Sequence, residues 1–190
     1  MNDPLAELLS SRVRAAVLAR FVAQPAAASL TELATRLGLS ISSVQHECYK
    51  LERLGVLIAR REAGSRRYRL ADDSAIVAAL TQLVIATRGR EALLALALRE
   101  LSGLERALLV PPEPASSPAP THLVVIGEVP LDQLDAALDR AATLLDLPPD
   151  RLALAFYRPH DWQTRTTEEH TLAHRILTTH HTVLVGDDSS

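Results

Sequence analysis

The chain has 190 residues, of which 47% are hydrophobic, and this is enough to build the core of one or two domains. Its single cysteine, Cys48, excludes a disulfide framework and a metal site made only of protein thiolates. The formal net charge of −3 hides an asymmetry: residues 1–71 carry eleven Arg or Lys and six Asp or Glu, whereas residues 72–190 carry nine and seventeen. A basic first part and an acidic second part predict two domains with different partners.

The chain shows no sign of a membrane or export signal. Its N-terminus lacks a basic start followed by an apolar run, so we expect no signal peptide. The most apolar stretch, residues 75–87, is shorter than the roughly 20 apolar residues that span a bilayer. We therefore expect a cytoplasmic protein without a membrane partner.

The first part of the chain predicts three helices. Apolar residues recur at helical spacing from Leu5 to about Val22. The segment Ser29-Leu30-Thr31-Glu32 has the pattern of a capping box and opens a short second helix, which Gly38 ends. A third helix is predicted from Ile41 to Leu54. Two short helices joined by a glycine-containing turn are typical of a helix-turn-helix.

A β-hairpin is predicted directly after these helices. Val56–Ala59 and Arg66–Leu70 are short strand candidates on either side of a Gly64-Ser65 turn. On the second strand Tyr68 would face the core, so we expect the arginines of the hairpin to point outward. A helix-turn-helix followed by such a hairpin is a winged helix.

The stretch "LATRLGLSISSVQHECYKLERLGVLIARREAGSRRYRL" resembles the winged helix of ArsR/MarR-type bacterial transcriptional regulators. The pattern consists of Leu-Gly-Leu-Ser, a recognition helix, Leu-Glu-x-x-Gly-Val and a basic wing. The resemblance implies that the recognition helix enters the major groove of double-stranded DNA and that the wing follows the backbone or minor groove. Cys48, on the inner face of that helix, is read as a small buried apolar residue and not as a metal-sensing thiolate.

The candidate DNA-binding residues lie on the outer face of the predicted recognition helix and on the wing. Gln45 suits a bidentate contact to adenine, Ser42 and Ser43 suit base edges or phosphates, and Lys50 and Arg53 suit phosphates. Glu47 would repel DNA unless it accepted a hydrogen bond from a cytosine amino group, and Tyr49 has packing against the wing as an alternative. The full candidate set is Ser42, Ser43, Gln45, His46, Tyr49, Lys50, Arg53, Arg60, Arg61, Ser65, Arg66, Arg67 and Arg69.

A helical connector and a small α/β layer are predicted after the wing. Residues 74–101 have helical periodicity with a break near Gly89, and this connector offers either a dimer interface or packing on the second domain. Five prolines within residues 110–121 predict an irregular loop between apolar runs. The remainder predicts a helix over 131–145, a strand over 152–157, a helical stretch over roughly 161–179 and a strand over 182–185.

Residues 104–188 resemble the minimal nucleotidyltransferase domain of the polymerase-β type that some bacterial winged-helix regulators carry. The cues are a strand ending in Gly-Glu-Val, a Leu-Asp-x-Leu helix, a strand ending in Tyr-x-Pro and the terminal Val-Leu-Val-Gly-Asp. Active members carry Gly-Ser after the first strand and an Asp-x-Asp pair on the next. Here Pro111 and Pro112 replace the Gly-Ser, and Pro120 and His122 occupy the Asp-x-Asp positions. The resemblance thus implies a domain without catalytic residues that serves dimerisation or sensing.

We expect no metal site and no cofactor. His170 and His174 are four residues apart and would share a face of the predicted helix, with three further histidines nearby. The chain has neither an HExxH motif nor a second cysteine, so these residues are interpreted as polar surface histidines.

These patterns predict an α+β protein with three parts. A winged helix-turn-helix occupies residues 1–72, a helical connector residues 73–103, and a nucleotidyltransferase-like α/β domain residues 104–188. The predicted function is a DNA-binding transcriptional regulator, a dimeric repressor without enzyme activity. The alternatives are a winged helix that binds protein instead of DNA, and an active nucleotidyltransferase targeted by its winged helix.

Overall fold

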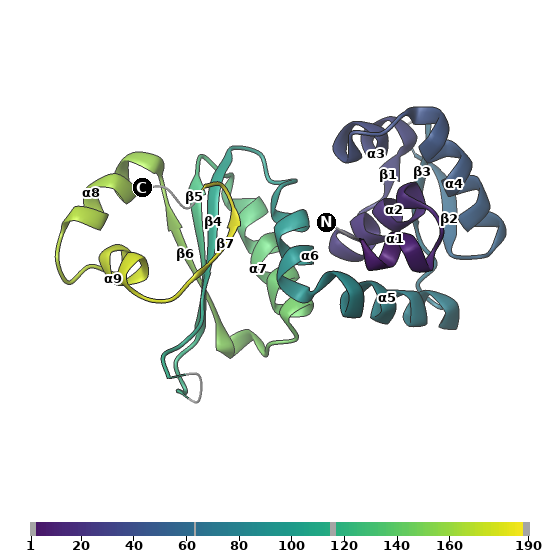
Figure 1. Cartoon of the computed structure of the whole chain (residues 1–190). Helices are drawn as coiled ribbons and strands as arrows, with labels where there is room; N and C mark the ends of the chain where they lie inside the picture. Colours follow the sequence, from purple (N-terminus) through teal and green to yellow (C-terminus); the bar gives the residue numbers. More distant parts are fainter. Residues whose placement is uncertain (1–2, 63, 115–116, 188–190) are drawn as a thin grey trace. The chain divides into compact units, whose positions relative to one another are not determined.

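A computed structural model describes residues 3–62, 64–114 and 117–187 of the chain, which forms two compact units, Met1–Leu93 and Leu94–Ser190 (Figure 1). Residues 1, 2, 63, 115, 116 and 188, which the predicted domains include, lie outside the described residues. The first unit contains, in chain order, α1 (Pro4–Leu8), α2 (Arg12–Ala23), β1 (Ala28–Ser29), α3 (Leu30–Leu37), α4 (Ile41–Arg53), β2 (Leu57–Glu62), β3 (Ser65–Leu70) and α5 (Ala75–Arg88). The next helix, α6 (Arg90–Leu98), begins in the first unit and ends in the second.

The helix predicted from Leu5 to Val22 is in fact two helices, and the single-helix prediction was wrong. Ser10 adopts a positive φ of 51°, which stops α1. Ser11 then caps α2 by accepting a hydrogen bond from the backbone N–H of Arg14 at 3.1 Å. Because serine is a strong N-cap residue, two adjacent serines end one helix and start another despite the continuous apolar periodicity.

The predicted helix-turn-helix is confirmed in its local detail. The backbone N–H of Ser29 donates to Glu32 at 2.7 Å, and the N–H of Glu32 donates to Ser29 Oγ at 3.3 Å, which completes the capping box. Gly38 ends α3 in the left-handed conformation at φ 63°. Val44, Cys48 and Leu51 on α4 are at most 2% exposed and form its inner face.

The first unit is completed by a three-stranded antiparallel sheet in the order β1-β3-β2. Tyr68 on β3 is 4% exposed, so the predicted packing of the hairpin through this residue is confirmed. α5 packs on α1 and α2, which places this part of the predicted connector in the first unit.

A partly buried ion pair between Arg14 and Glu47 connects α4 to α2. The Arg14 Nε donates to Glu47 at 2.8 Å, and an Arg14 Nη donates to the carbonyl oxygen of Leu9 at 3.0 Å. Glu47 is only 7% exposed and lies on the inner side of α4, away from the outer face that carries the candidate DNA-binding residues. Burial opposes the charged carboxylate, but the hydrogen bond and charge of Arg14, with help from Lys50, hold the pKa of Glu47 below its ordinary value.

The second unit is built on a mixed four-stranded sheet in the order β6-β5-β4-β7, in which only β5 and β6 are parallel. Helix α7 covers one face and α8 and α9 cover the other, so the unit has three layers (Figure 1). Its elements after α6 are β4 (Leu104–Val110), β5 (Thr121–Gly127), α7 (Leu131–Leu145), the 3₁₀ turn η1 (Pro149–Arg151), β6 (Leu152–Tyr157), α8 (Pro159–Thr167), α9 (Leu172–Thr178) and β7 (Thr182–Val185).

The α8–α9 face of the sheet holds an apolar core. Alternate residues of the strands point to this face. Trp162 and Ile176 from the helices pack against them and are 5% and 2% exposed. The predicted continuous helical stretch is broken at His170, which has a positive φ of 74° and precedes α9. His170 and His174 therefore do not share a helix face.

No helix in the described part of the chain is long and apolar enough to cross a membrane.

We predict that Glu47→Gln lowers the free energy of opening of the α2–α4 pair by about 1–3 kcal/mol at neutral pH, because it removes a charge-assisted hydrogen bond. A pKa held low in the folded state stabilises the fold above the ordinary value of 4.5, and this contribution disappears as the pH falls through the folded-state pKa. The difference between wild type and variant should therefore shrink below about pH 4.

Hydrogen–deuterium exchange of the α2 and α4 amides measures this quantity without interference from the second unit. The matched control is Asp73→Asn, an equal charge change at an exposed position. If the wild type and the variant differed in their free energy of opening by the same amount at every pH from 7 to 3, the assigned charge state of Glu47 would be wrong.

Candidate nucleic-acid interface

Helix α4 presents a polar outer face. Among the predicted site residues of this helix, Ser42, Ser43, Gln45, His46 and Tyr49 are all exposed, opposite the apolar face described above. The sequence therefore places these residues correctly, since a 3.6-residue period separates them from the buried positions. Such a face offers hydroxyl, amide and imidazole groups to a partner.

The serines at the start of α4 also serve the helix itself. Ser40 is the N-cap and accepts a hydrogen bond from the backbone N–H of Ser43 at 3.2 Å. The Ser40 hydroxyl also donates to Ser43 Oγ at 2.7 Å and lies 3.2 Å from Ser42 Oγ. This cluster of hydroxyls sits at the positive end of the helix dipole, a position suited to an anionic group.

The C-terminal half of the outer face carries two cations with different surroundings. The guanidinium of Arg53 lies over the ring of Tyr49, 5.9 Å from its centroid, so Tyr49 pairs with its own helix and not with the wing. The ammonium of Lys50 lies 3.4 Å from Glu47 and is half-exposed. Arg53 is therefore the more available partner for a phosphate.

The wing places four arginines in two pairs across its strands. Arg60 on β2 lies opposite Arg67 on β3, and Arg61 lies opposite Arg66. Like charges facing each other across a hairpin destabilise it unless they are neutralised. The structure supplies carboxylates for the β3 members, and it leaves Arg60 and Arg61 on β2 exposed and without an ion pair among the described residues.

Arg66 is held by Glu52 at the end of α4. One Nη lies 2.6 Å from each carboxylate oxygen of Glu52, and this bond together with the nearby Tyr68 raises the pKa of the guanidinium. The same guanidinium lies over the ring of Tyr68, 5.5 Å from its centroid. The Arg66 side chain is still 57% exposed, so the pair joins wing and helix but keeps the arginine accessible. Glu52 belongs to the Leu-Glu-x-x-Gly motif, but the sequence analysis did not predict this contact.

Arg67 and Arg69 are less accessible than predicted, because each has partners within the first unit. Arg67 donates to the carbonyl oxygen of Ala27 at 2.7 Å and to Glu32 at 3.1 Å, which ties β3 to the start of α3. The backbone N–H of Ser29, acting against burial and assisted by Arg67, lowers the pKa of Glu32. Arg69 pairs with Asp72. The side chains of both arginines are less than a third exposed, because these contacts hold them against the first unit.

Cys48 carries no reactive thiolate. Its side chain is fully buried in the inner face of α4, and burial, reinforced by the negative charges of Glu47 and Glu52, raises the pKa of the thiol to about 12. The interpretation as a small buried apolar residue is therefore confirmed.

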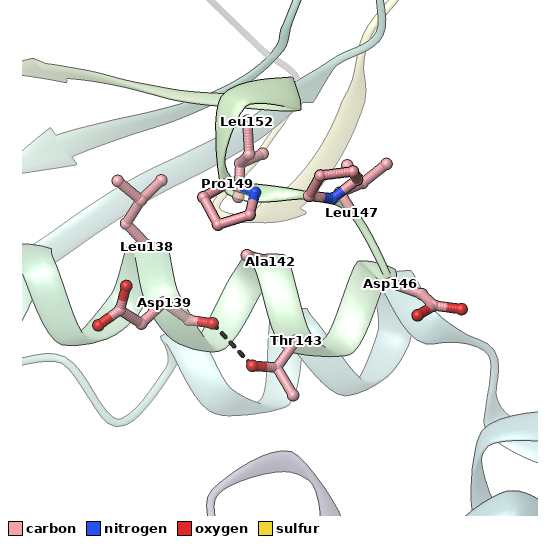
Figure 2. A pocket seen from close by; sticks show the side chains of 9 residues that line it. Leu138, Asp139, Ala142, Thr143, Asp146, Leu147, Pro149 and Leu152 are labelled. Atoms are coloured by element: carbon pink, nitrogen blue, oxygen red, sulfur yellow. Dashed lines mark hydrogen bonds between the residues drawn. The ribbon is translucent and has the colours of Figure 1, made fainter.

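The second unit contains a cavity of about 680 Å³ beside α7 (Figure 2). Leu138 and Ala142 from α7 face Leu152 and the segment that leads into η1 (Figure 2). Asp139 and Asp146 lie at opposite ends of the α7 side of the cavity (Figure 2). Pro111, Pro120 and His122, the positions that the nucleotidyltransferase resemblance assigns to the site, do not line it.

A smaller cavity of about 290 Å³ does contain those positions. It lies where β4 ends and β5 begins, and its carboxylate-bearing lining residue is Glu113. Within the described ranges no group of three or more His, Cys, Asp or Glu side chains is arranged to hold a metal ion. A two-metal nucleotidyltransferase centre needs several oxygen ligands, which this lining does not supply.

The IclR helix-turn-helix domain family matches residues 14–59, which span α2, α3, α4 and the start of β2. No curated protein matches the chain. Among solved structures, reduced HlyU from Vibrio cholerae is 28% identical, with a TM-score of 0.35, and the match covers 43% of this chain and 82% of that one.

Two further structures show a similar extent of likeness. A MarR family transcriptional regulator from Silicibacter pomeroyi is 21% identical over 43% of this chain and 57% of its own, with a TM-score of 0.34. A homodimeric winged helix-turn-helix DNA-binding domain from Mycobacterium bovis, described as a possible ArsR-family transcriptional regulator, is 27% identical over 45% and 85%, with a TM-score of 0.32. With its hairpin and its IclR-type helix-turn-helix, the first unit is a winged-helix domain of the kind that transcriptional regulators carry.

Proposed function

We propose that the chain is a sequence-specific DNA-binding transcriptional regulator that acts in the cytoplasm. The observation that carries this proposal is the outer face of the winged helix: α4 exposes Gln45 and His46 beside a wing whose Arg60 and Arg61 have no carboxylate partner among the described residues. Amide side chains read base edges in the major groove, and unpaired arginines bind phosphates. The IclR-type match to residues 14–59 supports the same function.

We assign different tasks to the residues of this interface. Gln45 and His46 read bases, while the start of α4, Arg53 and the wing arginines Arg60 and Arg61 bind phosphates. Arg66 joins them from the tip of the wing. Arg67, Arg69 and Lys50 belong to the frame that holds the wing and helix in place.

We further propose that the regulator is a homodimeric repressor and that α5 contributes to the dimer interface. Only Val77 and Val84 of α5 are buried, whereas Ile76 is 56% exposed and Leu80 and Leu83 are half-buried, which leaves a partly accessible apolar stripe on the helix. A two-fold dimer predicts a palindromic site with half-sites one helical turn apart. A dimer that covers a promoter represses by blocking access to it.

We propose that the second unit is a nucleotidyltransferase-like domain without catalytic activity that serves dimerisation or sensing. The lining of the smaller cavity supports this, because prolines and a histidine occupy the positions of the phosphate-binding and metal-binding groups. Incubation with Mg²⁺, labelled nucleotides and candidate acceptor proteins should transfer no label. Transfer above the level of a heat-denatured control would contradict the proposal and support the enzyme alternative.

The wing is tested by the double substitution Arg60→Ala and Arg61→Ala. The variant should bind every duplex more weakly. The slope of log affinity against log salt concentration should become smaller in magnitude by roughly 2, because two phosphate contacts are lost. The measurement compares DNA from upstream of the chain's own gene with a scrambled duplex of equal length, at about 50 and about 200 mM salt. Two chains should bind each native duplex.

The control for the wing variant is Arg99→Ala with Arg165→Ala, which removes the same charge from exposed positions outside the first unit. If both double variants weakened binding equally, net charge and not the wing would be responsible. If the wild type ignored DNA even at low salt, the protein-binding alternative for the winged helix would replace the proposal.

Base reading is tested by Gln45→Ala. We expect the preference for the native over the scrambled duplex to fall by about 1–3 kcal/mol, roughly 5- to 150-fold, with little change in non-specific affinity. Arg53→Ala is the matched control on the same helix, since loss of a phosphate contact should weaken both duplexes to the same extent. A Gln45→Ala variant that weakened both duplexes equally would show that this residue reads no base.

A further inference from the structure

The smaller cavity of the second unit lies between the sheet and α9. Val110 at the end of β4 and His122 at the start of β5 are register partners, and both lie on the sheet face that α8 and α9 cover. Leu172, Arg175 and Ile176 from α9 close the opposite side. The cavity of about 290 Å³ is at the small end of the about 300–1,000 Å³ that is typical of small-molecule sites.

The polar groups of this cavity come from the sheet, from α9 and from the loop that joins β4 to β5. Arg175 lines the cavity from α9, and its exposed side chain has no hydrogen bond or ion pair with the residues that the structure describes. The imidazole of His122 is half-buried, and its burial, followed by the charge of Arg175, lowers its pKa. At neutral pH the site thus offers one unpaired cation next to a neutral ring that can donate a hydrogen bond.

Most of the remaining lining is apolar. Besides Glu113, Ala119 and Thr179, it consists of aliphatic side chains from β4 and α9 and of prolines from the loop that joins β4 to β5, namely Val110, Leu172, Ile176, Pro111, Pro112 and Pro120. Because proline fixes its own φ, this wall has little freedom to lose when a ligand binds. A mostly apolar lining with one arginine and one neutral histidine suits a ligand that has an apolar body and a single anionic group.

We propose that this cavity binds a small aliphatic carboxylate. The Arg175 guanidinium takes the carboxylate through paired N–H···O bonds, the His122 ring donates a further hydrogen bond, and the aliphatic part of the ligand packs against Leu172, Ile176 and the prolines. Arginine matches carboxylate geometry better than a point charge would.

The charge of the lining selects against polyanions. Glu113 also lines the cavity, so with His122 neutral the formal charges of Glu113 and Arg175 cancel. A ligand with one carboxylate adds a single negative charge, which lies against the guanidinium of Arg175. A nucleoside triphosphate brings several negative charges and needs metal ions, and this lining supplies neither enough cations nor a set of oxygen ligands. The inference concerns the second unit alone and does not depend on DNA binding.

The test is a titration of the full chain with isovalerate, followed by NMR of the histidine rings. The His122 resonances should shift saturably, whereas those of His46 in the first unit should not move. Isopentanol, which has the same apolar body without the carboxylate, and inorganic phosphate, which has charge without an apolar body, should each bind at least about tenfold more weakly. Equal binding of isopentanol or of phosphate would overturn the proposal, as would the absence of a saturable shift with isovalerate.

The residue assignment is tested by Arg175→Gln, with Arg165→Gln on α8 as the control for charge. Arg175→Gln should raise the dissociation constant for isovalerate about tenfold or more, and Arg165→Gln should leave it unchanged. The fluorescence of Trp162, the single tryptophan, reports on the packing of the second unit and verifies that each variant is folded. Isovalerate binding that survived Arg175→Gln in a folded variant would overturn the assignment.

Discussion

The first unit depends on the neutralisation of like charges in its wing. Two arginines of β2 face two arginines of β3, and a hairpin of this composition would repel itself without nearby carboxylates. Glu52 at the end of α4 and Glu32 in the first turn of α3 supply them. The wing is therefore held in place by ion pairs to α3 and α4. The arginines of β2 remain exposed and can pair with a charged partner.

Glu47 and Arg14 form a second ion pair that holds part of this domain in place. Their ion pair connects α4 to α2 and uses a carboxylate that would otherwise repel a phosphate backbone. Acidic residues in this domain thus serve to position basic and polar ones. The second unit is built differently, as a mixed sheet covered by helices on both faces. The polar residues of its smaller cavity lie near the loop that joins β4 to β5.

Local chemistry made much of this fold predictable from the sequence. The capping box at Ser29, the left-handed glycine at position 38 and the alternation around Tyr68 depend on neighbours only a few residues away. The serine cap that divides the first helix is also local, but the continuous apolar period concealed it.

The partners of the charged residues could not be predicted in this way. Arg14 and Glu47 are 33 residues apart, and Arg67 reaches the carbonyl oxygen of Ala27 across 40 residues. Periodicity assigns a residue to a face but does not say which opposite charge lies across from it. For this reason the outer face of α4 was predicted well, whereas the roles of Glu47, Arg67 and Arg69 came from the structure.

The Glu52–Arg66 pair has a consequence for how a regulator of this kind finds its site. An arginine that already has a carboxylate partner must exchange it for a phosphate, so it adds less to the attraction for random duplex than a free arginine does. Weak attraction to random duplex shortens each stop during the search along the genome. Under the proposed function, Glu52 would thus favour rapid scanning, and long residence would be left to sites where α4 makes its own contacts.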